Sequence, residues 1–69
     1  MDRTPVDSSS IADIGYDESS MTLEVGFLNS TVYQYFDVPQ SVYLEFLAAS
    51  SKGTFLSSQI KNNFRYAKL

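Results

Sequence analysis

The chain has 69 residues, 43% of them hydrophobic and 19% charged, which is typical of one small folded domain and argues against a disordered tail or a multi-domain enzyme. It contains no Cys and no His, which excludes disulfides, Cys/His zinc sites, thiol nucleophiles and imidazole bases, so we expect no metal and no cofactor. The net charge of −3 is divided unevenly, because residues 1–45 hold one basic and eight acidic residues, whereas residues 46–69 hold four basic residues and no acidic one.

The first nine residues mix charged residues with Thr, Pro and Ser and show no periodicity, which predicts a flexible N-terminal arm over residues 1–9. Residues 10–69 are expected to form a single domain. No apolar run approaches the roughly 20 residues that a membrane-spanning helix needs. The chain also lacks the cationic start and apolar stretch of a secretory signal, so a cytoplasmic location is expected.

Two strands and two turns are predicted at the start of this domain. Residues 10–16 are rich in strand-forming residues and end at the polar cluster 17–20, which suits a turn. Residues 21–28 alternate between apolar and other side chains. The apolar side of this segment consists of Leu23, Val25 and Phe27. Asn29-Ser30 then fits a tight hairpin, in which Asn tolerates a positive φ.

The third strand, residues 32–36, carries large rings on both of its sides. Tyr33 and Tyr35 share one side, and Val32, Gln34 and Phe36 share the other. We predict that the tyrosine side faces the core, because Gln34 interrupts the other side. The three strands then form an antiparallel meander.

Two helices are predicted after Val38-Pro39, where proline ends the strand and suits the first turn of a helix. The spacing of apolar residues predicts the first helix over about residues 40–50. Gly53 is expected as its left-handed C-terminal cap. Thr54 is expected as the N-cap of a second, short helix that ends near Asn62.

The tail from Phe64 to Leu69 alternates apolar and basic residues, which predicts an extended segment with Phe64 and Tyr66 turned inward. Together the elements predict an α+β fold, in which a three-stranded antiparallel β-meander is followed by two helices packed on one face and a short extended C-terminal tail.

Several short motifs follow one another from Ser8 to Leu69, with Tyr33-Gln34-Tyr35 at their centre. The others are Ser8-Ser9-Ser10-Ile11, Ile14-Gly15-Tyr16-Asp17, the Leu23/Val25/Phe27 strand, Val38-Pro39, Ala49-Ser50 through Gly53, Phe55, Ile60 and the Phe64/Tyr66 tail. Their order and spacing resemble the KTSC domain, a module found at the C-terminus of some lysyl-tRNA synthetases and as a free-standing bacterial protein. Asn29-Ser30 and Phe64 depart from the glycine and tyrosine that are frequent in that family.

The resemblance implies a domain of unknown molecular function, for which the synthetase context suggests RNA binding. It supplies no catalytic or binding residues. The family's Tyr-x-Tyr signature, here Tyr33 and Tyr35, is expected to be structural, because so small a domain needs both rings for its core. The competing interpretation is that the two rings form a platform that stacks unpaired bases. The acidic residues Glu24, Asp37 and Glu45, which are near in the sequence, argue against it, because they would repel RNA.

Catalysis is not expected from this chain. Ser58 and Lys61 match the Ser-x-x-Lys spacing of some serine nucleophiles, but this spacing is common by chance and the enzymes that use it are several times longer. Ser58 and Lys61 are therefore interpreted as part of a solvated helix face.

The basic residues of the last third are the better candidates for binding an anion such as RNA. These candidate site residues are Lys52, Lys61, Arg65 and Lys68. The leading hypothesis is a non-enzymatic interaction module that contacts RNA or tRNA weakly through this segment. The alternative is a protein-binding adaptor or homodimer that uses a sheet edge or an apolar patch. An exposed, contiguous patch would favour that alternative if it comprised Leu28, Phe36, Tyr43 or Leu44.

Overall fold

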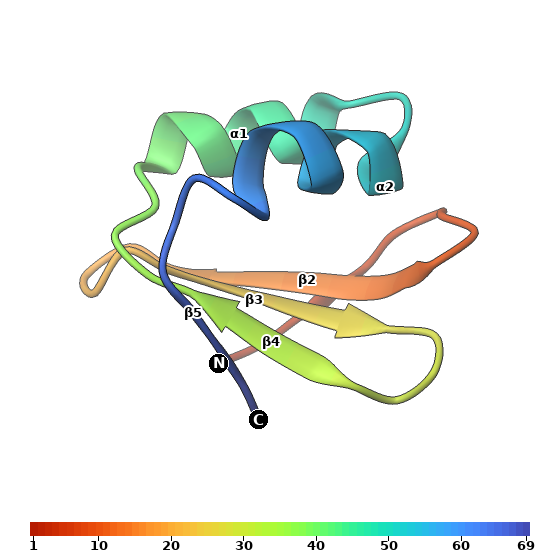
Figure 1. The fold of residues 1–69 in the computed structure, drawn as a ribbon, viewed down its shortest axis with the longest axis horizontal. Helices are drawn as coiled ribbons and strands as arrows, with labels where there is room; N and C mark the ends of the chain where they lie inside the picture. The colour runs from red at the N-terminus through yellow and green to blue at the C-terminus, as the bar shows by residue number, and fades with distance from the viewer.

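The computed structural model describes all 69 residues and places two layers against each other, a five-stranded antiparallel sheet and a layer of helices that covers one of its faces (Figure 1). The strands are β1 (Thr4–Pro5), β2 (Ile11–Asp17), β3 (Thr22–Phe27), β4 (Val32–Tyr35) and β5 (Tyr66–Lys68), and they lie side by side in that order. The helices are α1 (Gln40–Ala48), α2 (Lys52–Phe55) and the π-helical turn η1 (Leu56–Ile60), which continues α2. The α+β class and the antiparallel meander are confirmed.

The predicted number of strands is wrong, because the sheet has two more. The tail forms β5, which pairs with β4 and places Tyr66 opposite Tyr35. At the other edge, β1 pairs with β2 and places Thr4 opposite Ile14. Both added strands are very short and become strands only through their neighbours. The mobility expected of residues 1–9 stays a prediction, as does the domain boundary at residue 10.

Both predicted turns are present and are held by short polar side chains. The Asp17 carboxylate accepts hydrogen bonds from the hydroxyls of Ser20 (2.7 Å) and Ser19 (2.9 Å), which hold the pKa of Asp17 below its usual range. In the second turn, Asn29 Oδ1 accepts a hydrogen bond from the Thr31 amide at 3.1 Å. The positive φ of 73° belongs to Ser30 and not to Asn29.

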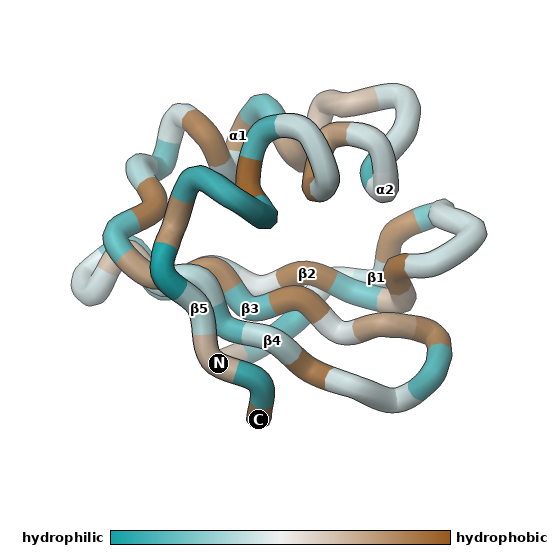
Figure 2. The backbone as a smooth tube through the Cα atoms, viewed as in Figure 1, coloured by the Kyte–Doolittle hydropathy of each residue, from teal (hydrophilic) through white to brown (hydrophobic).

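The core lies between the helices and the sheet face that carries Tyr33 and Tyr35. Nine buried side chains form it: Ile11, Ile14, Leu23, Val25, Tyr35, Val38, Phe46, Leu56 and Ile60. Apolar residues alternate with other residues along β3, as the colours in Figure 2 show, whereas an irregularity between Ile11 and Asp13 interrupts the pattern in β2. The predicted inward orientation of the tyrosine side is confirmed, because Tyr35 is buried and Tyr33 packs against the core.

The first helix ends close to its predicted position, but the second begins earlier than predicted. Ser51, and not Thr54, is the N-cap of α2, and its hydroxyl accepts from the Thr54 amide at 3.3 Å. Gly53 lies inside α2 and has no positive φ, so its predicted role as a left-handed cap is wrong. Several Ser and Thr residues here are competent caps, and the local sequence does not decide among them. No helix has the length and apolar character needed to span a membrane.

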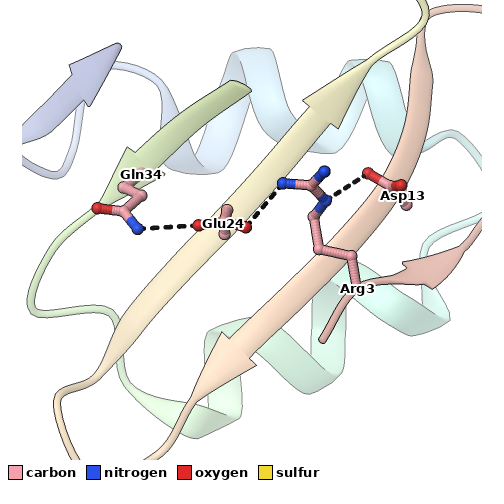
Figure 3. A network of polar contacts seen from close by, with 4 residues as sticks. All are labelled: Arg3, Asp13, Glu24 and Gln34. Carbon is pink, nitrogen blue, oxygen red and sulfur yellow. Dashed lines mark hydrogen bonds and ion pairs between the residues drawn. The ribbon is translucent and has the colours of Figure 1, made fainter. Parts of the chain in front are cut away.

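The N-terminal residues cross the sheet face that the helices leave uncovered, and they carry Arg3 into a polar network (Figure 3). Arg3 Nη1 lies 2.7 Å from Glu24 Oε2, and Arg3 Nε lies 2.9 Å from Asp13 Oδ1. Gln34 Nε2 donates to the other Glu24 oxygen at 2.9 Å. Gly15 permits this close approach, because a Cβ there would lie 2.6 Å from the Asp2 carbonyl oxygen.

Tyr16 ties the sheet to the start of α1. Its ring stacks on Tyr43 with the centroids 4.7 Å apart, and its hydroxyl donates to the Val38 carbonyl at 2.6 Å. Desolvation, followed by the charges of Glu18 and Asp17, raises the pKa of Tyr16. The phenolic proton is therefore held more tightly in the folded protein than in the unfolded chain.

This raised pKa predicts a loss of stability at alkaline pH. The unfolded chain releases the Tyr16 proton first, near pH 10, so the contribution of Tyr16 to the free energy of unfolding should be constant below about pH 10 and fall above it. Tyr16→Phe should cost about 1 kcal/mol at pH 7 and flatten that alkaline decline. Urea denaturation of both proteins at neutral and alkaline pH measures this. An unchanged alkaline slope in Tyr16→Phe would assign the decline to other tyrosines.

Candidate functional site

A cleft of about 390 Å³ opens between the tyrosine side of the sheet and the α2–η1 segment. Four aromatic side chains line it: Phe27, Tyr33, Tyr35 and Tyr66. Lys61 also lines it, and no Asp or Glu does. In a chain with a net charge of −3, the cleft thus has one cation and no acidic group in its wall.

The pairing of the strands assembles the aromatic wall. Tyr35 lies opposite Tyr66, and the side chains of paired residues share a face of the sheet. The Tyr33 ring is central, with its centroid 6.4 Å from that of Tyr35, 5.8 Å from that of Tyr66 and 5.7 Å from that of Phe27. The Tyr33 and Tyr35 rings are stacked, and the Phe27 ring meets Tyr33 edge-on. The wall is therefore a continuous aromatic surface.

The wall runs from a buried ring to an open one. Tyr35 is 3% exposed, whereas Tyr66 is 59% exposed. The prediction that Tyr66 is turned inward is wrong, because Tyr66 lies on the tyrosine side of the sheet but remains open to solvent. No helix covers it, because η1 ends at Ile60. Tyr66 and Lys68 are two residues apart, as are Tyr33 and Tyr35, so in an extended chain each pair lies on one side. This spacing was the one sequence signal that Tyr66 could belong to the aromatic wall.

The Tyr35 hydroxyl differs from that of Tyr16. The Tyr16 hydroxyl is bonded to a backbone carbonyl, whereas the Tyr35 hydroxyl forms no hydrogen bond within the chain. Desolvation, followed by the neighbouring Tyr33 and Tyr66, raises the pKa of Tyr35. At neutral pH this hydroxyl is protonated and can donate a hydrogen bond.

The structure brings two of the four predicted basic residues to the tyrosine side. Lys61 follows η1 and lines the cleft. Lys68 lies opposite Tyr33 in the sheet, so its side chain shares the tyrosine side. Lys61, Arg65 and Lys68 do not lie along one helix, because η1 ends at Ile60 and the chain after it becomes extended.

The other two basic residues have partners elsewhere. Arg65 Nη2 lies 2.8 Å from Asp37 Oδ2, and its guanidinium lies 5.5 Å from the centroid of the Phe36 ring. Lys52 Nζ donates to the Ala49 carbonyl at 2.6 Å. The four residues thus do not converge on one concave surface.

The acidic residues that weighed against a role for the tyrosines lie away from the cleft. Glu24 is on the opposite face of the sheet with Arg3, and Asp37 is paired with Arg65. Glu45 lines a separate groove beside the C-terminal end of α1. These three acidic side chains therefore lie outside the cleft.

The Ser58 and Lys61 side chains do not form a nucleophile and base pair. The Ser58 hydroxyl donates to the Thr54 carbonyl at 2.9 Å and lines the groove beside Glu45, whereas Lys61 lines the tyrosine cleft. No group of three or more acidic residues has an arrangement that could hold a metal ion.

The apolar residues considered as a protein-binding patch are spread over the molecule. Leu28 follows β3 and Phe36 follows β4, so the two lie at opposite ends of that hairpin. Leu44 is exposed on α1, whereas Tyr43 is partly covered by its stacking on Tyr16.

Comparison with known proteins identifies the family. The KTSC domain family matches residues 7–64. The chain belongs to this family. The crystal structure of a KTSC domain protein from Yersinia pestis superposes with a TM-score of 0.95 at 41% identity, covering 99% of this chain and 96% of that one.

Relatives of this KTSC domain occur alone and within a larger enzyme. A protein of Tsukamurella paurometabola is 38% identical over 65 residues, which cover 94% of this chain and 97% of that protein. A lysine–tRNA ligase of Trichormus variabilis is 36% identical over 63 residues, which cover 91% of this chain and 11% of the ligase. The KTSC domain therefore corresponds to about one tenth of that ligase.

Proposed function

We propose that this KTSC domain is a small non-enzymatic module that binds RNA, including tRNA, through Lys61 and Lys68 on the tyrosine side. The observation that carries the proposal is the composition of the cleft, which has one lysine and no acidic residue in its wall although the chain is acidic overall. The relationship to a lysine–tRNA ligase supports RNA as the anion. A cytoplasmic location belongs to the same proposal.

The electrostatics favour weak binding that depends strongly on salt. Two lysines that contact two phosphates of a single strand give a slope of about −1.4 in a plot of log affinity against log salt concentration. Arg3 and Arg65 partly neutralise carboxylates away from the tyrosine side, which lessens repulsion of the approaching RNA.

Charge reversal at the two lysines tests the proposal. Labelled tRNA and a single-stranded RNA are titrated at low salt against the wild type and against Lys61→Glu/Lys68→Glu, which should bind at least tenfold more weakly. Lys52→Glu/Arg65→Glu is the matched control, because it changes the net charge equally, and it should keep its affinity within about threefold.

Two outcomes would contradict the proposal. Equal losses in both double variants would mean that only net charge matters, and an absence of RNA binding by the wild type would remove the function itself. The protein-binding alternative would then be tested by the oligomeric state and by capture of partner proteins.

A further inference from the structure

We infer that the tyrosine cleft binds one unstacked nucleotide, with the base against Tyr33 and Tyr66, a polar group of the ligand at the Tyr35 hydroxyl and the phosphate at Lys61. The inference rests on the proposed function for the source of the nucleotide, which is an unpaired residue of RNA. A free nucleotide has the same chemistry, and the experiment below separates the two sources.

The Tyr35 hydroxyl indicates a polar ligand. Tyr35 lines the cleft, and its hydroxyl, whose oxygen is reached by solvent rather than fully buried, has no hydrogen-bond partner in the chain. A hydroxyl that is open to a cleft and unpartnered within the chain is free to bond water or a ligand there. Since this hydroxyl stays protonated at neutral pH, it offers a donor to a carbonyl, ring nitrogen or phosphate oxygen.

The aromatic wall indicates a flat ligand. Tyr33 and Tyr66 are tilted by 35° to each other with their centroids 5.8 Å apart, and Tyr66 is open to solvent. Exposed tyrosine rings in RNA-binding domains stack on unpaired bases, whichever base is present. Bases within a duplex have their faces covered by their neighbours, so an unstacked nucleotide is required.

The remaining wall suits the sugar and phosphate. Lys61 is the single charged side chain in the wall, and the amides of Asn29 and Asn62 also line the cleft. The volume of about 390 Å³ lies within the range of small-ligand sites and fits one nucleotide rather than a duplex.

The first test compares ligands for the wild-type protein. A ten-nucleotide single-stranded RNA, a blunt duplex of the same sequence and adenosine monophosphate are titrated, and binding is followed by anisotropy and by amide chemical shifts. The single strand should bind at least tenfold more tightly than the duplex. Both it and the mononucleotide should shift the signals of Tyr33, Lys61 and Tyr66.

The second test uses variants of the wall. Tyr35→Phe should weaken binding of the single strand about fivefold to tenfold, as expected for one lost hydrogen bond, while its thermal midpoint stays equal or rises. Tyr66→Ala should weaken binding about tenfold. Tyr43→Phe is the matched control, because Tyr43 stacks on Tyr16 outside the cleft, and it should leave binding unchanged.

The outcomes separate this inference from the proposed function. If RNA binds but duplex and single strand bind equally, and Tyr35→Phe has no effect, the nucleotide site is overturned while RNA binding stands. If no RNA binds, the proposed function falls. In that case, chemical-shift changes caused by the mononucleotide would assign the cleft to a free nucleotide. The absence of such changes would overturn the cleft as a nucleotide site.

Discussion

Phe46→Ala is expected to lower the free energy of unfolding by about 3–5 kcal/mol, the cost of removing a buried aromatic ring. Phe46 has no exposed surface and is the one buried residue of α1, and its ring stacks on Phe55 of α2 with the centroids 5.4 Å apart. A domain of this size has a total stability on the order of 3–10 kcal/mol. The substitution should therefore remove about a third or more of the stability of the domain.

Urea denaturation followed by circular dichroism measures this effect. Leu44→Ala is the matched control, because Leu44 lies on the same helix and is 53% exposed, and it should change the stability by less than about 0.5 kcal/mol. A loss below about 1 kcal/mol in Phe46→Ala would show that α1 is held by other contacts.

Arg3→Ala is expected to lower the free energy of unfolding by about 2–3 kcal/mol. It leaves the buried carboxylate of Glu24 without its counter-ion, and the loss of one partner from a fully buried pair costs about 3–5 kcal/mol. We expect the smaller cost of about 2–3 kcal/mol because the Arg3 side chain is 30% exposed, so solvent weakens the ion pair. The same substitution should release the N-terminal residues, which hydrogen exchange of the β1 and β2 amides would detect.

Arg65→Ala provides the comparison, because it also removes an arginine from a short ion pair. The side chains of Arg65 and Asp37 are 74% and 67% exposed, so its cost should stay below about 1 kcal/mol. Combining Arg3→Ala with Glu24→Gln should recover part of the loss, since the buried charge of Glu24 is then gone and only the carboxylate of Asp13, whose side chain is 30% exposed, is left without Arg3. Equal costs for the two arginines would refute a special role for the network around Glu24.

The central strands could be predicted because their buried residues follow a local pattern in the sequence. Leu23 and Val25 are two residues apart, which is the spacing of side chains on one side of a strand. In the next strand, Gln34 indicates which side is less apolar. The structure places Leu23 and Val25 in the core and Gln34 beside Glu24 on the other face. The edge strands could not be predicted in the same way, because Thr4 and Tyr66 become strand residues only through partners distant in the sequence.

The candidate site was only partly visible in the sequence for the same reason. The basic character of the last third pointed to Lys61 and Lys68, but the pairing of Arg65 with Asp37 spans 28 residues and has no local signal. The cleft wall depends on β5 lying beside β4, which the sequence did not indicate. The unpartnered Tyr35 hydroxyl is a property of the packed structure alone.

The two shortest strands also govern how the sheet meets other molecules. An exposed edge attracts further strands through its unpaired amides and carbonyls, and proteins commonly blunt their edges with proline, lysine or short strands. Here one edge is the dipeptide Thr4–Pro5, in which proline offers no amide, and the other is Tyr66–Lys68, which carries a lysine. Both edges of the sheet thus carry features that hinder the addition of a further strand.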